Sequence, residues 1–110
     1  MEEYPDQEIG TEVPTNTGSI DIVRKDKDSY IFYEIKPSQS IKSNIRQGLA
    51  QLLEYAYWNE IEKISELVII GPCPSSDSSK KYLEKLRTEF NIPIYYRFYN
   101  PDSFTLTSKE

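Results

Sequence analysis

Charged residues interrupt two short apolar runs of this chain. Asp21 lies within residues 20–23, and Glu34 and Lys36 lie within residues 30–36. A buried unpaired charge costs several kcal/mol or more, so a fold that buries these runs has to compensate the charges. Two carboxylates and one lysine can do so by sharing a divalent cation. A hard cation held in this way can activate water for hydrolysis.

The composition is that of one small globular domain. A chain of 110 residues with 37% hydrophobic and 28% charged residues is long enough for one core. No apolar run approaches the length of a membrane span. The acidic N-terminus has no apolar signal region, which argues against secretion and predicts a cytoplasmic protein.

The residue types that are missing restrict the chemistry. Histidine is absent and Cys73 is the only cysteine. This excludes a disulfide framework, a multi-cysteine zinc site and any histidine-dependent nucleophile. Chemistry would therefore rely on carboxylates, lysine, tyrosine and metal-activated water. Cys73, between two prolines, is expected to be an incidental loop residue.

The net charge of −5 bears on the kind of partner. It argues against strong nonspecific binding to DNA through a basic surface. Bound cations would change the local sign of the charge, and partner subunits or further domains could supply a basic surface.

The spacing of apolar residues predicts an α/β fold in the order β-β-β-α-β-α-β. Three strands on short links form an antiparallel meander, with a hairpin turn at residues 15–18. A helix capped by Ser38 or Ser40 runs to about residue 61. A buried parallel strand, a second helix and a last strand follow, which gives a mixed sheet with helices packed on it. The expected strands cover residues 9–13, 19–24, 30–36, 67–70 and 94–99, and the second helix covers 80–90.

The same pattern sets the expected domain bounds. Residues 1–7 are predicted to be disordered or a linker, residues 8–100 to form the domain, and residues 101–110 to form a tail. No internal repeat or low-complexity segment divides the chain further.

The charged residues of the two runs can converge. Side chains alternate along a strand, so Glu34 and Lys36 project from the same face. Asp21 meets them from the adjacent strand if the register of the hairpin allows. The carbonyl oxygen of Ile35 is a candidate further ligand, because Mg²⁺ prefers oxygen. Lys36 would orient or help to deprotonate the attacking water, or stabilise charge at a phosphate.

Two polar residues of the predicted helix extend this constellation. Gln51 and Tyr55 are one turn apart, on the flank of the apolar stripe. Such a position can line a groove between helix and sheet. Gln51 could hold a phosphate oxygen or a metal-bound water, and Tyr55 could donate a hydrogen bond to the phosphate or position Lys36.

Together these motifs resemble those of the PD-(D/E)xK nuclease superfamily, and most of all its branch with a RecB-like QxxxY helix. The resemblance rests on Gly18-x-x-Asp21, Glu34-x-Lys36 and Gln51-x-x-x-Tyr55. The motifs span residues 18–55, and the order of elements extends the similarity to about residue 99. Family members usually carry a helix before the meander, which is not evident here, so a domain cut from a longer protein is expected.

The resemblance implies a restriction-endonuclease-like fold, DNA as the substrate and Mg²⁺ or Mn²⁺ as the cofactor. It implies that Asp21 and Glu34 are metal ligands and that Lys36 is the catalytic lysine. By the same resemblance, Gln51 and Tyr55 are accessory residues. The implied activity is metal-dependent hydrolysis of phosphodiester bonds. A homodimer, or additional domains of a longer chain, would help so small a domain to cover a duplex.

Other interpretations remain open at this point. The chain could be a catalytically inactive module on the nuclease scaffold that binds nucleic acid or a partner protein. It could also be an interaction domain unrelated to nucleases, in which Glu-x-Lys is an ordinary strand pattern. Tyr57 and Trp58 are expected to belong to the core or to an interface, and Lys42 and Arg46 to a solvated helix face.

Overall fold

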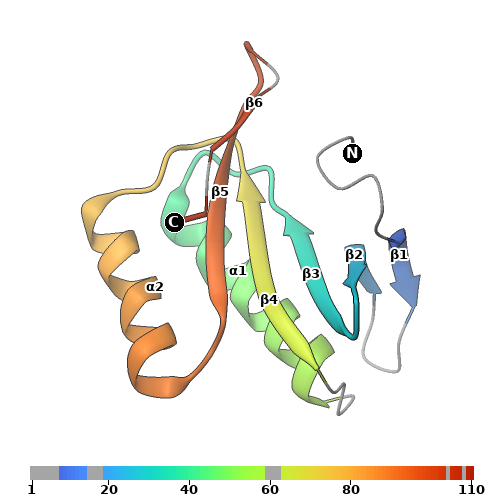
Figure 1. Cartoon of the computed structure of the whole chain (residues 1–110). Helices are drawn as coiled ribbons and strands as arrows, with labels where there is room; N and C mark the ends of the chain where they lie inside the picture. Colours follow the sequence, from blue (N-terminus) through green and yellow to red (C-terminus); the bar gives the residue numbers. More distant parts are fainter. Residues whose placement is uncertain (1–7, 15–18, 59–62, 104, 108) are drawn as a thin grey trace.

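The computed structural model describes residues 8–14, 19–58, 63–103, 105–107 and 109–110, with side chains from residue 22 onward except that of Asp26. The expected linker at 1–7 and the expected turn at 15–18 lie outside these ranges. The described chain forms an α/β fold with one mixed sheet and two helices (Figure 1), as the sequence predicts. No helix in the described ranges has the length and apolar character needed to cross a membrane.

The sheet has the strand order β1-β2-β3-β4-β5-β6. The first three strands form the expected antiparallel meander, and β4 and β5 run parallel to β3. The short strand β6 pairs antiparallel with β5. The apolar strands β3 and β4 are therefore central, each with a paired strand on both sides. The strand bounds are β1 Glu8–Pro14, β2 Ser19–Asp26, β3 Ser29–Ile35, β4 Ile64–Gly71, β5 Ile94–Asn100 and β6 Thr105–Leu106.

A tight turn joins β2 to β3. Asp26 pairs with Ser29, so the turn has two residues rather than the five expected from the polar sequence. Lys27 takes the positive φ of 58° that a short hairpin turn of this kind needs. The tight turn fixes the register of β2 against β3, and this register decides which residues face each other across the two strands.

Helix α1 runs from Ile41 to Leu53 and continues as a π-helical turn, Glu54–Trp58. The hydroxyl of Ser40 caps it by accepting a hydrogen bond of 3.2 Å from the backbone N–H of Ser43. The expected end of this helix at residue 61 lies outside the described residues. Helix α2, Asp77–Phe90, begins three residues earlier than predicted. A reciprocal capping box between Ser76 and Ser79 starts it there.

Both helices cover the same face of the sheet (Figure 1). They bury a core that joins Leu52 of α1 and Leu83 of α2 to Phe32, Ile69 and Tyr96 of the strands. Helix α1 approaches the sheet closely at Gly48, where a Cβ atom would lie 2.9 Å from Cγ1 of Ile69. The other face of the sheet carries a second buried cluster around Ile31, Tyr33, Val68 and Ile70.

Described residues after Pro101 pair with the edge of β5. Besides β6, Glu110 exchanges backbone hydrogen bonds of 2.9 and 3.0 Å with Tyr96. The carboxylate of Glu110 also accepts a hydrogen bond of 2.9 Å from the hydroxyl of Ser75. Strand β6 has only two residues, too few to show the alternation of apolar and polar side chains that marks a strand. The sequence therefore predicts only a tail here.

Candidate functional site

Glu34 and Lys36 lie together where β3 ends. The backbone N–H of Lys36 donates a hydrogen bond of 2.9 Å to the carbonyl of Ile70, which prolongs the pairing of β3 with β4 by one residue. The Nζ atom of Lys36 lies 3.2 Å from Oε2 of Glu34, and their side chains are 14% and 5% exposed. The alternation of the strand thus places both side chains on one face, as the sequence predicts.

This face is the one that the helices cover, because Phe32 belongs to the core beneath α1 and Glu34 follows it by two residues. A carboxylate so deeply buried needs a compensating partner. Lys36 supplies a positive charge, and its small exposed fraction keeps the ammonium in reach of solvent. The pair therefore has one buried acid and one cation that can meet a ligand.

The register of β2 against β3 determines the position of Asp21 relative to Glu34. Ile22 pairs with Tyr33 in this antiparallel ladder. Continuing the register by one residue places Asp21 opposite Glu34, and directly opposite positions share one face of a sheet. The side chain of Asp21 lies outside the described residues, so its part in the site stays a prediction.

The oxygen donors at this point suit a hard divalent cation. The carboxylate of Glu34 lies here, and the backbone carbonyl of Ile35 and, by register, the carboxylate of Asp21 are the further ligands that the sequence predicts. Among the residues whose side chains are described, no group of three or more acidic, cysteine or histidine side chains gathers, either here or elsewhere. The donor set is all oxygen, which fits Mg²⁺ or Mn²⁺ in ligand chemistry.

The two accessory residues of α1 differ in their surroundings. Gln51 is exposed. Tyr55 is buried, and its ring packs edge-on against Phe32 with the centroids 4.7 Å apart. Burial raises the pKa of the Tyr55 phenol, and the nearby phenol of Tyr30 adds to the rise. The expectation that Tyr55 faces a groove with little core packing is wrong, because Phe32 extends the core to this flank of the helix.

A buried polar cluster lies next to the site and escaped sequence reasoning. Asn44, 1% exposed, accepts a hydrogen bond of 3.1 Å from the backbone N–H of Ser38 and donates one of 2.7 Å to its carbonyl. Asn44 thereby fixes the loop that leads from Lys36 into α1. The signal in the sequence was Asn44 itself, a polar residue among the buried residues of the helix. A buried amide needs hydrogen-bond partners, so such a residue predicts a buried polar cluster.

Cys73 and Tyr96 complete this cluster. The hydroxyl of Tyr96 donates a hydrogen bond of 2.6 Å to the carbonyl of Cys73. The Sγ atom of Cys73 lies 3.4 Å from the Tyr96 hydroxyl and 3.5 Å from Nδ2 of Asn44. Burial, followed by the contact with Cys73, raises the pKa of the Tyr96 phenol well above its ordinary value. Cys73 is therefore a buried part of the scaffold and not an incidental loop residue.

The remaining polar and aromatic candidates lie on the surface. Lys42 and Arg46 are exposed, which confirms the expected solvated face. Tyr57 and Trp58 are exposed as well, Trp58 to 74%, so neither is a core residue.

No protein-family model, curated protein or solved structure matches this chain.

Proposed function

We propose that this chain is a metal-dependent nuclease with a restriction-endonuclease-like fold of the PD-(D/E)xK type, and that it hydrolyses phosphodiester bonds of DNA. One observation carries the proposal: the 3.2 Å ion pair between Lys36 and the buried carboxylate of Glu34 at the end of a central strand. A buried ion pair is often no more stabilising than apolar residues of similar volume. Its presence here therefore favours a role in chemistry over a role in stability.

Each residue has a distinct role in this proposal. Asp21, Glu34 and the carbonyl of Ile35 would hold Mg²⁺ or Mn²⁺. The cation, when bound, supplies charge neutralisation at the phosphate and a more acidic water. Lys36 donates to a phosphate oxygen or holds the attacking water, since an ammonium has three N–H donors and Glu34 engages only part of them.

Helix α1 and its π-helical turn contribute three residues to the site. The exposed amide of Gln51 is available to donate to a phosphate oxygen. Tyr55 acts as a packing residue beneath β3, because its ring lies against Phe32. Asn44 positions the loop after Lys36 through its two hydrogen bonds with Ser38.

A second candidate function is a catalytically inactive module on the same scaffold that binds nucleic acid or a partner protein. The net charge of −5 favours the protein-binding form of this module, because an acidic surface repels the phosphate backbone of nucleic acid. The ion pair itself also neutralises a carboxylate that a nuclease would use to hold its cation.

Cleavage of DNA separates the two functions. Wild type is incubated with single-stranded, linear and supercoiled DNA with Mg²⁺, with Mn²⁺ and with a chelator. Glu34→Gln and Lys36→Met should lower cleavage about 100-fold or more. Glu66→Gln is the matched control, because Glu66 pairs with Lys109 away from the site. Cleavage that survives in both site variants would disprove the site. If wild type cleaves DNA with neither ion, the nuclease is excluded and the inactive binding module is the function that remains.

A further inference from the structure

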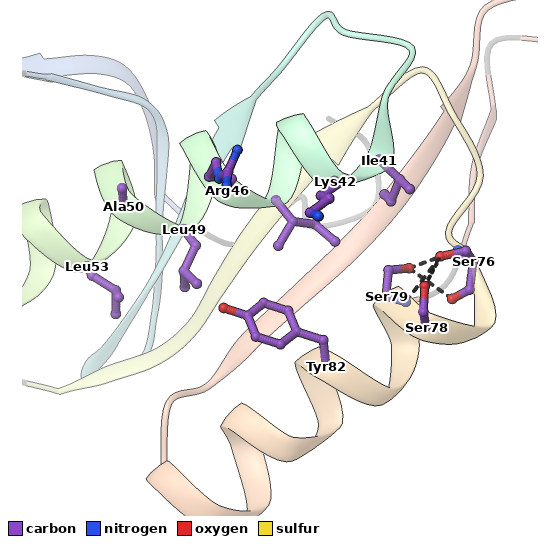
Figure 2. Close-up of a pocket in the computed structure, with 11 residues that line it drawn as sticks. Ile41, Lys42, Arg46, Leu49, Ala50, Leu53, Ser76, Ser78, Ser79 and Tyr82 are labelled. Atoms are coloured by element: carbon purple, nitrogen blue, oxygen red, sulfur yellow. Dashed lines mark hydrogen bonds between the residues drawn. The ribbon is translucent and has the colours of Figure 1, made fainter.

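An apolar groove runs between the two helices on the side away from the sheet (Figure 2). Its volume is about 660 Å³. Tyr82, on α2, points its ring toward α1 across the groove and is half exposed. The wall on α1 is made by apolar residues at every fourth position, namely Ile41, Ile45, Leu49 and Leu53.

The length of this wall suits a helical occupant. From residue 41 to residue 53 an α-helix rises about 18 Å, or somewhat more than three turns. A long apolar channel between two helices is the kind of surface into which a third amphipathic helix packs, with anchors at helical spacing.

The charges along the groove are of one sign. Lys42 and Arg46 line it one turn apart, and its described lining contains no carboxylate. Neither residue forms an ion pair within the part of the chain that the structure describes. In a chain with a net charge of −5, this edge is a local exception, and it complements acidic side chains.

We propose that this groove docks an acidic amphipathic helix of another protein. The apolar face of that helix lies on Tyr82 and on the partly exposed Ile41 and Leu53. Its carboxylates, one turn apart, meet Lys42 and Arg46. Nucleic acid fits less well, because the phosphate backbone would leave the apolar wall uncovered.

The proposal goes beyond the nuclease function and stands without it. At 100° per residue, Gln51 lies about 180° around α1 from Lys42. The groove and the candidate metal site therefore occupy opposite flanks of one helix. Binding at the groove can be measured without a divalent cation or cleavage.

Two labelled helical peptides of about 14 residues test this inference. Both carry leucines at i, i+4, i+7 and i+11, and they differ only in carrying glutamates or lysines at the flanking positions. Fluorescence anisotropy measures their binding to the full chain, next to a single-stranded oligonucleotide of equal charge. We expect wild type to bind the glutamate peptide and to lose affinity as salt is added.

The variant Lys42→Glu/Arg46→Glu should bind the glutamate peptide about tenfold or more weakly than wild type and should bind the lysine peptide more tightly. Lys85→Glu makes the same type of charge change on the exposed face of α2 and should change neither affinity. The neutral variant Lys42→Gln/Arg46→Gln serves if the charge reversal unfolds the chain, as judged by circular dichroism.

Three results would overturn the proposal. The first is no binding of the glutamate peptide at millimolar concentration, and the second is equal binding of both peptides to wild type. The third is an oligonucleotide that binds and loses its affinity in the same variants, which would assign the groove to nucleic acid.

Discussion

The Nζ atom of Lys36 lies 3.2 Å from Oε2 of Glu34, and the pair sits at the point where β3 ends beside β4. Glu34 is the more buried partner, while Lys36 keeps some contact with solvent. Because Glu34 has less contact with water, its carboxylate relies on the ion pair for stabilisation more than the ammonium of Lys36 does.

The asymmetry predicts unequal costs of mutation. Lys36→Met removes the ammonium that faces this buried carboxylate and should lower the free energy of unfolding by roughly 2–4 kcal/mol. Glu34→Gln should cost less, because the lysine can turn its ammonium toward water. The variant Glu34→Gln/Lys36→Met should be more stable than Lys36→Met alone. Urea unfolding at neutral pH measures all three, and strictly additive losses would show that the two side chains do not interact.

Substitutions of Gln51 and Tyr55 should differ in their effects on stability. Gln51→Ala changes an exposed residue, so its stability should stay within about 0.5 kcal/mol of wild type while cleavage falls. Tyr55→Ala empties the space beside Phe32 and should cost about 3–5 kcal/mol. Thermal melting alongside the cleavage assay tests both. A large loss of stability in Gln51→Ala would mean that this residue is structural.

The tyrosine phenols predict how stability depends on pH. Burial raises the pKa of Tyr96 above its ordinary value of 10.0. Below pH 10 the phenol is protonated in the folded and the unfolded chain. At higher pH the unfolded chain releases the proton first, so the free energy of unfolding falls as pH rises. Tyr55, whose pKa is also raised, adds to the fall.

Tyr96→Phe isolates this contribution. The variant lacks the hydrogen bond to the carbonyl of Cys73 and should lose about 1–3 kcal/mol at neutral pH. Its stability should then decline less steeply than that of wild type between neutral pH and pH 11, followed by urea unfolding. Equal slopes in the two proteins would show that Tyr96 ionises as easily in the folded chain as in the unfolded one.

Gly48 should resist substitution although it lies within a helix. Gly48→Ala gains about 1 kcal/mol of helix propensity. The new methyl group would lie 2.9 Å from Cγ1 of the buried Ile69, and overpacking of this kind costs about 1–3 kcal/mol. We expect a net loss of roughly 1 kcal/mol by urea unfolding. Ala50→Gly, on the exposed side of α1, is the control that measures helix propensity alone. A Gly48→Ala variant more stable than wild type would refute the close packing against Ile69.

The fold was predictable because its signals are local. Alternating apolar residues, Pro37 after the third strand and a capping serine define the meander and α1. The convergence of Glu34 and Lys36 followed from their spacing along one strand.

Other features depend on distant residues. The burial of Tyr55 is decided by Phe32, which lies on another element, and helical spacing alone cannot show it. The cluster of Asn44, Cys73 and Tyr96 joins three elements, so no single stretch of sequence carries it.

Anomalous diffraction from crystals grown with Mn²⁺ tests the central claim, that Asp21 and Glu34 share a divalent cation beside Lys36, most directly. We predict a peak roughly 2.0–2.5 Å from carboxylate oxygens of both residues and near the carbonyl of Ile35, and no such peak in Asp21→Asn. Carboxylates of Asp21 and Glu34 on opposite faces of the sheet, or Mn²⁺ bound to neither of them, would contradict the claim.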